Sequence, residues 1–407
     1  MKRVLFVTWD GPDQNYLQSL FFPIFVGMRA HGFRVDVLQF RWGTEQQTAQ
    51  VSAAATASAI GYRSVQIRRR PKLLGALGSV AYGALILGQV LRRREFDLVM
   101  PRSILPGQML NLARSSIPVV FDADGLPADE RVEFAGWSAH GGLYRVWRDI
   151  EAEAVRRASA VITRTRAAKA VLLERAGPQT CAEGIIVAPN GKDENVFSPG
   201  QPEQRALTRR QCGIPEQVPW LVFAGSIGPQ YRPDALLALY RLVLARAPDA
   251  RLTILTGQEA EVLALLSSQG LTSANVNVLR AAPDDVPKYL AAADLGLAFR
   301  AASFSQRAVS PIKVAEYLLC GLPVLANTGV GDLDQQVPAS AGRLLADTEP
   351  ESLLGAADWF VREVCVQRER YREAARAAGL ASFSLPRCAQ RYATACNFAL
   401  ERGATKR

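Results

Sequence analysis

Short apolar runs alternate with longer amphipathic stretches along the whole chain. In the first half we predict strands at "RVLFVTW", "FRVDVLQF", "SVQIRR", "DLVMPRS", "PVVFDAD", "AVITRT" and "GIIVAPN". In the second half we predict them at "WLVFAGSI", "ARLTILTG", "VNVLRAA", "LGLAFR", "PVLAN" and "GRLLAD". Near-continuous apolar runs separated by helical segments are typical of parallel strands that are buried on both faces.

This alternation occurs twice, and the Pro- and Gly-rich stretch "PNGKDENVFSPGQPEQ" separates the two series. We therefore predict an α/β fold with two doubly wound, Rossmann-like domains facing each other across a cleft. The first domain is expected at residues 1–183, an interdomain linker at 184–200 and the second domain at 201–384. A last helix, about residues 385–407, is expected to pack back on the first domain. Ligands should bind in the cleft, at the carboxyl ends of the strands.

The most membrane-like stretch is Leu73 to Leu91, "LLGALGSVAYGALILGQVL". Two interpretations stay open: a packed crossover helix, or a helix that lies on an anionic lipid surface. A membrane span is disfavoured, because it would interrupt the strand–helix–strand series. The basic residues that flank the stretch are Arg68, Arg69, Arg70, Lys72, Arg92, Arg93 and Arg94.

Net charge is +10, and residues 1–200 account for +7 of it. A basic first half indicates an anionic partner such as phosphates, a membrane surface or nucleic acid. Nucleic-acid binding is not expected, because the arginines are not interleaved with aromatics and no recognition motif is present. The opening "MKRVLFVTWD" turns polar too early for a signal peptide, so we expect a cytoplasmic protein, with the inner face of the cell membrane as a peripheral location.

The six cysteines form no C-x-x-C pair, and two histidines are too few for a zinc site of usual spacing. We predict no metal and no cofactor. His31 ends the first helical stretch and is expected to be structural. His140, in "WSAHGGLYRVW", is either structural or a contact for an acceptor substrate.

The stretch "SPIKVAEYLLCGLPVLANTGVGD" begins at Ser310 and predicts a helix from about Pro311 to Cys320. Ser310 suits the N-cap, Pro311 the first turn and Gly321 the position after the helix. Because the start of a helix has positive partial charge, a lysine there is unfavourable unless an anion lies nearby.

Lys313 and Glu316 are three residues apart and share one face of this helix, whereas Ile312, Ala315 and Leu319 are expected to face the core. A diphosphate would satisfy both Lys313 and the N–H groups of the first turn. Glu316, one turn further on, could accept hydrogen bonds from two ribose hydroxyls. The alternative is a solvated i,i+3 ion pair with no ligand.

"SPIKVAEYLLCGLPVLA" resembles the nucleotide-binding signature of GT-B glycosyltransferases of the retaining family 4 type, which act in bacterial polysaccharide assembly. The pattern P-x-K-x-x-E-Y-x-x-x-G-x-P-V is matched at Pro311, Lys313, Glu316, Tyr317, Gly321, Pro323 and Val324. "VAPNGKDENVFSP", "FAGSIGPQYRPDALL" and "IEAEAVRRASAVITRT" are similar to further segments of that family, so the resemblance covers essentially the whole chain.

The resemblance implies that Lys313 binds the donor diphosphate and Glu316 the donor ribose. It also implies that Gly225, Ser226 and Gly228 form a loop that approaches the phosphates, where small residues allow close backbone contact. Many relatives have Arg and Lys after this loop; the nearest candidate here is Arg232. The donor would be a UDP-sugar, or else a GDP-sugar. The basic residues that flank the apolar stretch suit a polyprenyl-diphosphate-linked saccharide as the acceptor, at the inner face of the membrane.

The sequence departs from the family pattern at three places. Ala308 replaces a glutamate that holds the donor hexose in many members, so we consider Arg307, Ser305 or Gln306 as substitutes. In "TWDGPDQNYLQS", Gly11 alone remains of a Gly-Gly loop. Asp122 and Asp124 stand where many members have a histidine.

The "DAD" segment is open to three interpretations. Asp124, with Asp122 beside it, could contact the acceptor; "DADG" could simply form a turn; or the two carboxylates could bind a divalent cation. The last is disfavoured, because that motif belongs to a different glycosyltransferase fold.

We therefore predict a metal-independent glycosyltransferase that moves a sugar from a nucleotide-sugar donor to an acceptor hydroxyl, for which the resemblance implies retention. The predicted catalytic residues are Lys313, Arg232 and Asp124. The donor side adds Gly225, Ser226, Gly228, Ser310, Pro311, Glu316 and Arg307, and the acceptor side Gly11, Asp122 and His140. Two rivals remain: a nucleotide-sugar 2-epimerase, and a non-catalytic subunit that binds a nucleotide sugar.

Overall fold

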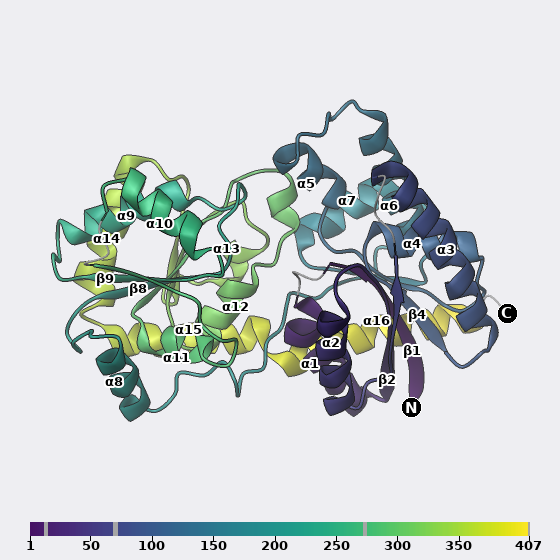
Figure 1. Ribbon diagram of the computed structural model, residues 1–407, viewed down its shortest axis with the longest axis horizontal. Coiled ribbons are helices and arrows are strands. Elements are labelled where there is room, and N and C mark those ends of the chain that lie inside the picture. Colours follow the sequence, from purple (N-terminus) through teal and green to yellow (C-terminus); the bar gives the residue numbers. More distant parts are fainter. Residues whose placement is uncertain (12–14, 68–71, 272–274, 406–407) are drawn as a thin grey trace. The chain divides into compact units, whose positions relative to one another are not determined.

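The computed structural model describes residues 1–11, 15–67, 72–271 and 275–405. The chain forms two compact units, each shown in Figure 1. Unit 1 comprises Met1–Gly191 and Leu385–Arg407, and unit 2 comprises Lys192–Ser384. The chain therefore leaves unit 1 once, builds unit 2 as one continuous segment, and returns to unit 1 with its last helix.

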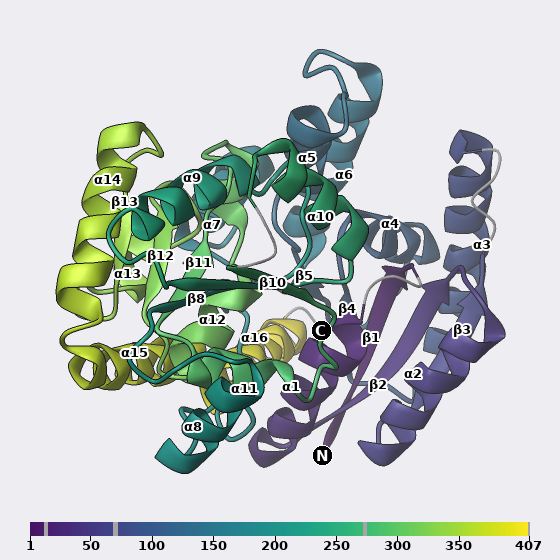
Figure 2. The same cartoon turned by 60° about the vertical axis from the view of Figure 1, so that its left-hand side comes forward.

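The sheet of unit 1 is parallel throughout the described residues. Its first part has the strand order β3-β2-β1-β4 and its second part β5-β6-β7; Figure 2 shows β1, β2 and β3 side by side. Parallel bridges Val99–Val119 and Arg102–Asp122 join β4 to β5. The strands are β1 (Lys2–Asp10), β2 (Phe33–Arg41), β3 (Tyr62–Gln66), β4 (Leu98–Pro101), β5 (Val120–Asp122), β6 (Ala160–Thr163) and β7 (Ile185–Val187).

The helices of unit 1 cover this sheet and supply its core. On one face, buried side chains of α3 and α4 pack against β1, β2 and β3. The last helix, α16, contacts α1, η2 and strands β4 to β7. The helices are η1 (Leu17–Phe21), α1 (Phe22–Gly27), η2 (Met28–His31), α2 (Glu45–Ala57), α3 (Lys72–Arg92), α4 (Ile104–Ala113), α5 (Pro127–Phe134), α6 (Gly142–Arg157), α7 (Arg166–Ala176) and α16 (Leu385–Thr405).

Unit 2 has a parallel sheet of order β10-β9-β8-β11-β12-β13. Figure 1 shows α9, α10 and α14 on one face of it and α11, α12 and α15 on the other, and each face has its own apolar core. The strands are β8 (Trp220–Ala224), β9 (Arg251–Leu255), β10 (Val276–Leu279), β11 (Leu295–Ala298), β12 (Val324–Asn327) and β13 (Gly342–Leu345). The helices are α8 (Pro202–Gln211), α9 (Pro233–Leu244), α10 (Glu259–Ser268), α11 (Val286–Ala292), η3 (Ser305–Ala308), α12 (Ile312–Leu319), α13 (Leu333–Gln336), α14 (Pro350–Trp359), η4 (Phe360–Val364) and α15 (Arg368–Phe383).

The strand order reverses once in each sheet, between β1 and β4 in unit 1 and between β8 and β11 in unit 2. At such a switch point the loops leaving two neighbouring strands diverge to opposite faces, and open α/β sheets bind ligands there. The residues after β1, β4, β8 and β11 are therefore the positions where the fold favours a site.

Each apolar run that the sequence analysis assigned to a strand contains or overlaps a strand of the structure, and the pairing is parallel as predicted. The apolar stretch between β3 and β4 is the crossover helix α3. Among the described residues, only α3 is long and apolar enough to cross a membrane, over Gly75–Arg92, and a third of that stretch is buried.

Candidate functional site

Helix α12 is buried almost all round in the core of unit 2. Val314, Ala315, Leu318 and Leu319 are fully buried, whereas Ile312, expected in the core, is only half-buried. The helix starts one residue later than predicted: Pro311, with ψ near 114°, is the N-cap in place of Ser310. An extended proline before the first turn and a boundary shift of one residue are both common.

The end of α12 is fixed as the sequence indicated. Gly321 has φ of +68°, a left-handed conformation that glycine adopts without strain. The Gly321 N–H donates to the Leu318 carbonyl oxygen at 3.0 Å, and the Leu322 N–H donates to that of Tyr317 at 2.9 Å. This is the Schellman arrangement, which turns the chain directly into β12.

Lys313 extends from the first turn of α12 into an aromatic environment. Its Nζ lies 3.7 Å from the ring centre of Phe223 and 4.4 Å from that of Tyr231. The side chain is 92% buried, and its amine has no hydrogen-bond partner among the described residues. Burial and the Arg300 guanidinium lower the pKa of this amine well below its ordinary value, and Glu316 opposes them weakly. An anion entering here would gain a strong, desolvated contact.

The Gly225–Gly228 loop leaves β8 directly above this amine. Gly225 is exposed and has φ of +125°, and a Cβ added to it would lie 3.4 Å from the Lys313 Nζ. The loop is held by the Gly225 N–H, which donates to the Leu255 carbonyl, and by the Ile227 N–H, which donates to Gln258 Oε1. Because Gly225 has no side chain, the backbone of the loop lies close to the amine.

Glu316 is paired, and its partner was not recognised in the sequence. Its Oε1 lies 2.9 Å from the Nζ of Lys192, a buried lysine in the predicted linker. The Lys192 amine also lies 4.8 Å from the ring centre of Phe197. The ion pair orients the carboxylate one turn beyond Lys313, so the two predicted donor residues do not neutralise each other.

Arg300, which follows β11 by two residues, was also missed. Its backbone N–H donates to Asn327 Oδ1 at 2.9 Å, and its Nε donates to Gln306 Oε1 at 2.6 Å. Its guanidinium lies 4.7 Å from the ring centre of Tyr231, the ring that also contacts Lys313. No sequence pattern indicated this contact, because it depends on an isolated antiparallel bridge between Tyr231 and Arg300.

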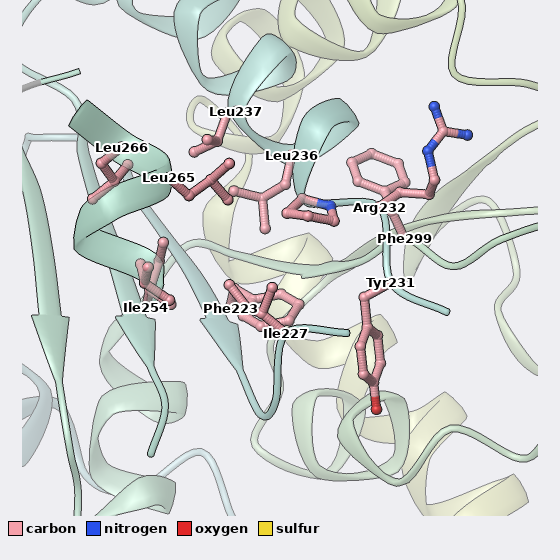
Figure 3. A pocket seen from close by; sticks show the side chains of 12 residues that line it. Phe223, Ile227, Tyr231, Arg232, Leu236, Leu237, Ile254, Leu265, Leu266 and Phe299 are labelled. Atoms are coloured by element: carbon pink, nitrogen blue, oxygen red, sulfur yellow. The ribbon is translucent and has the colours of Figure 1, made fainter. Parts of the chain in front are cut away.

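The other cations predicted for the donor side lie differently. Arg232 is bound by Asp234, with Nη2 to Oδ2 at 2.6 Å, and Figure 3 shows Tyr231 and Arg232 extending in opposite directions from their loop. The apolar pocket of Figure 3, which includes Phe223, Ile227 and Leu236, lies beside that loop. Arg307 is exposed and lies over the Phe304 ring, while Ser305, Gln306 and Ala308 are buried.

In unit 1 the "DAD" segment separates into a buried and an exposed carboxylate. Asp122 is fully buried and accepts hydrogen bonds from Arg164 at 2.7 and 3.0 Å and from the Tyr392 hydroxyl at 3.3 Å. Arg102 lies 3.4 Å from the same carboxylate. Asp122 is thus enclosed by side chains that directly follow β4 and β6 and by one from α16.

Asp124 is 41% exposed and binds Arg102, with Nη2 to Oδ2 at 2.7 Å. Asp10, at the end of β1, is buried and accepts a hydrogen bond from the Thr8 hydroxyl. Burial raises the pKa of Asp10, while Thr8 and Arg102 oppose this. Asp10 ends β1 and Arg102 follows β4, the two strands at the switch point of unit 1, and the sequence analysis had singled out neither.

The remaining candidates of unit 1 stand apart from this cluster. His140 is exposed in the turn before α6, and its backbone N–H donates to Ser138 Oγ. Gly11 packs against Trp42, where an added Cβ would lie 2.6 Å from the indole. No group of three or more His, Cys, Asp or Glu side chains lies close enough to hold a metal ion in the described part of the chain.

Two family models match consecutive parts of the chain. The model of "Glycosyltransferase Family 4" matches residues 25–196, and that of "Glycosyl transferases group 1" matches residues 204–378. The solved structure of HepE from Anabaena in complex with UDP superposes with a TM-score of 0.69 at 20% identity, covering 98% of this chain and 100% of that one. The chain belongs to the GT-B glycosyltransferases of the family 4 type.

Curated relatives of this GT-B chain have glycosyltransferase names. D-inositol 3-phosphate glycosyltransferase of Corynebacterium jeikeium is 29% identical over 277 residues, which are 65% of this chain and 62% of that protein. GDP-mannose-dependent monoacylated alpha-(1-6)-phosphatidylinositol monomannoside mannosyltransferase of Corynebacterium glutamicum is 30% identical over 157 residues, 37% and 40% of the two chains. The matched segments thus span less than two thirds of either relative.

The predicted fold is confirmed: both units are Rossmann-like, and the whole is GT-B. Of the predicted donor residues, the structure of unit 2 brings together Lys313, Glu316 and Gly225. The structure also places Lys192, Arg300 and Tyr231 beside these predicted residues. Arg232 and Arg307 make local contacts instead.

Proposed function

We propose that this protein transfers a sugar from a nucleotide-sugar donor to an acceptor hydroxyl. The observation that supports this most directly is the buried, unpaired amine of Lys313 at the start of α12. A buried cation without a partner is costly unless a ligand completes its contacts. The glycosyltransferase names of the curated relatives and the UDP in the HepE structure support the same proposal.

The donor is proposed to lie along α12. Lys313 and the first-turn N–H groups would hold the diphosphate under the Gly225–Gly228 loop, and Glu316, oriented by Lys192, would accept hydrogen bonds from the ribose. During transfer, negative charge builds up on the leaving diphosphate, and fixed cations and N–H groups stabilise it. Ser310 and Pro311 directly precede α12, and Ser226 lies in the Gly225–Gly228 loop. These three residues remain part of the proposed donor side.

The acceptor is proposed to bind unit 1 near Asp124, whose exposed carboxylate Arg102 holds in place. A carboxylate fixed by an arginine can accept a hydrogen bond from a sugar hydroxyl without changing its position. Retention of anomeric configuration remains part of the proposal through family membership. Gly11 and His140 remain proposed acceptor-side residues.

We propose that the acceptor is lipid-linked and that unit 1 meets the inner membrane surface through α3. One face of α3 packs on α4, while Leu77, Tyr82 and Leu85 are 61%, 49% and 67% exposed. Exposed Arg92 ends the helix and exposed Arg93 and Arg94 follow it, a pattern suited to anionic lipid. Arg68, Arg69 and Arg70, also predicted to flank it, lie outside the described residues.

The membrane proposal is tested by co-sedimentation with vesicles of anionic and of neutral phospholipid. We expect salt-sensitive binding to the anionic vesicles alone, weakened by Leu85→Glu and by replacing Arg92, Arg93 and Arg94 with alanine. Binding to neither vesicle, or equal binding by the variants, would contradict it.

The catalytic proposal is tested in two steps. A thermal-shift panel of UDP, GDP and their sugars identifies the donor, because a ligand of the folded state raises the melting temperature. Proton NMR of the products then separates transfer to an added acceptor from epimerisation of the donor at C2. Binding without any turnover would instead favour the non-catalytic subunit.

A further inference from the structure

We propose that Arg300 is the second cation that grips the donor diphosphate, with Tyr231 holding it beside Lys313. This inference rests on the proposed function, since it assigns a further residue to the same donor site. It gives the site a charged partner that neither Arg232 nor Arg307 supplies in the structure.

Arg300 is fixed at every point except the end that would meet a ligand. Asn327 accepts its backbone N–H, Gln306 accepts its Nε, and the Tyr231 ring covers the guanidinium. Its two terminal nitrogens have no hydrogen-bond acceptor among the described residues. Such an arrangement presents a rigid, two-pronged donor, which matches the oxygens of a phosphate.

Arg300 also differs from the other buried arginines in its charge balance. It is 93% buried, yet no carboxylate pairs with it in the described ranges. Buried arginines are normally paired, because an isolated charge is costly to desolvate. The other buried arginines of the described chain each face a carboxylate: Arg41, Arg102, Arg164, Arg205 and Arg209.

The unpaired arginine lies close to the unpaired lysine. The Tyr231 ring is 4.7 Å from the Arg300 guanidinium and 4.4 Å from the Lys313 amine, and Arg300 helps to lower the pKa of that amine. The nearby carboxylate of Glu316 already forms an ion pair with Lys192. Arg300 and Lys313 therefore lie on either side of the Tyr231 ring at the switch point between β8 and β11, with no carboxylate paired to either among the described residues, and a diphosphate would accept hydrogen bonds from both.

Titration calorimetry of Arg300→Gln and Arg300→Lys with UDP, UMP, GDP and GMP tests this assignment. For whichever base the wild type binds, we expect the diphosphate to lose about 10- to 100-fold in affinity in Arg300→Gln, as for a lost charged hydrogen bond. The monophosphate should lose less than about threefold, and Arg300→Lys should recover part of the loss. Arg362→Ala, which removes an arginine whose side chain is 78% exposed, is the matched control.

Two tyrosine variants test the positioning and guard against misfolding. Tyr231→Phe keeps the ring and should bind UDP or GDP like wild type, whereas Tyr231→Leu should lose affinity for the diphosphate selectively. Equal losses for mono- and diphosphate, or no loss in Arg300→Gln and Tyr231→Leu, would overturn the assignment while leaving the proposed function intact. A wild type that binds none of the four nucleotides would instead remove the proposed function, and this assignment with it.

Discussion

At the scale of single residues, the proposed donor site lowers the stability of unit 2. Lys313 is desolvated against two aromatic rings, and its amine lacks a hydrogen-bond acceptor among the described residues. A buried polar group in this state costs about 1–3 kcal/mol. Such local conflicts are expected where a ligand completes the structure.

Replacement of Lys313 by methionine should therefore separate stability from function. Lys313→Met keeps an unbranched side chain that is one atom shorter and removes the unpaired amine, so we expect a higher melting temperature for unit 2. About 1 kcal/mol corresponds to about 2–4 °C for a domain of this size. Differential scanning calorimetry with and without UDP or GDP should show this rise together with loss of the stabilisation by nucleotide. A variant that is less stable than wild type and is still stabilised by nucleotide would show that the amine does not bind the nucleotide.

The residue scale also shows where sequence reasoning failed. Lys313 and Glu316 could be predicted because they are three apart on one helix. Arg300 and Lys192 could not be predicted, because they lie outside α12 in the sequence. Arg300 is brought close by its bridge to Tyr231, and Lys192 by the path of the chain through the predicted linker. Arg232 was the nearest arginine in sequence, but Asp234 lies two residues away and binds it.

At the scale of elements, the position of α12 depends on a close crossing with α15. Gly379 of α15 lies against the backbone of α12, where an added Cβ would come within 2.7 Å of the Leu318 carbonyl carbon and the Leu319 nitrogen. Backbone atoms cannot move aside as a flexible side chain can. A single absent side chain thus sets the distance between two helices and, with it, the position of Lys313.

Substitution of Gly379 by alanine should displace α12 and lower stability together with donor binding. We expect a loss of about 1–3 kcal/mol, as for other overpacked cores, measured by denaturant unfolding. Gly355→Ala in α14 is the matched control: its added Cβ meets only an arginine nitrogen at 3.5 Å. That variant should gain about 0.5–1 kcal/mol from the better helix propensity of alanine. Equal behaviour of the two variants would disprove the close-crossing argument.

Elements were the part of the structure that the sequence predicted best. Strands buried on both faces give continuous apolar runs, and such runs identified the strands of both units. The predicted start of α12 was one residue too early. The choice between Ser310 and Pro311 as N-cap depends on backbone angles that the amino-acid sequence does not specify.

At the scale of the whole molecule, unit 1 contains a pH-sensitive cluster that joins α5, α6 and α7. Glu151 is buried and shares Arg175 with Asp129, while Tyr144 donates to Asp129 and Arg148 lies nearby. Burial raises the pKa of Glu151 to about 7, although Arg175 opposes this. The folded unit therefore holds the Glu151 proton more tightly than the unfolded chain does.

A raised carboxyl pKa makes stability fall as pH rises. The contribution is fully present below the ordinary glutamate pKa of about 4.5, and is lost as the pH rises to about 7. We expect the melting temperature of unit 1 to fall over this window in wild type and to change less in Glu151→Gln, followed by calorimetry at constant ionic strength. Glu153→Gln alters a partly exposed carboxylate on the same helix, whose pKa Arg156 and Arg157 lower, so it should leave the fall in stability towards pH 7 unchanged. The same slope in Glu151→Gln would exclude Glu151 as its source.

The return of α16 to unit 1 has a consequence for the order of events during synthesis. Unit 2 is one uninterrupted segment, so it can fold as soon as Ser384 has left the ribosome. Unit 1 cannot be completed until the final helix arrives, because the Tyr392 hydroxyl that donates to Asp122 comes from that helix. The unit translated first therefore matures last, and nascent chains should expose its apolar sheet to chaperones until α16 has been translated.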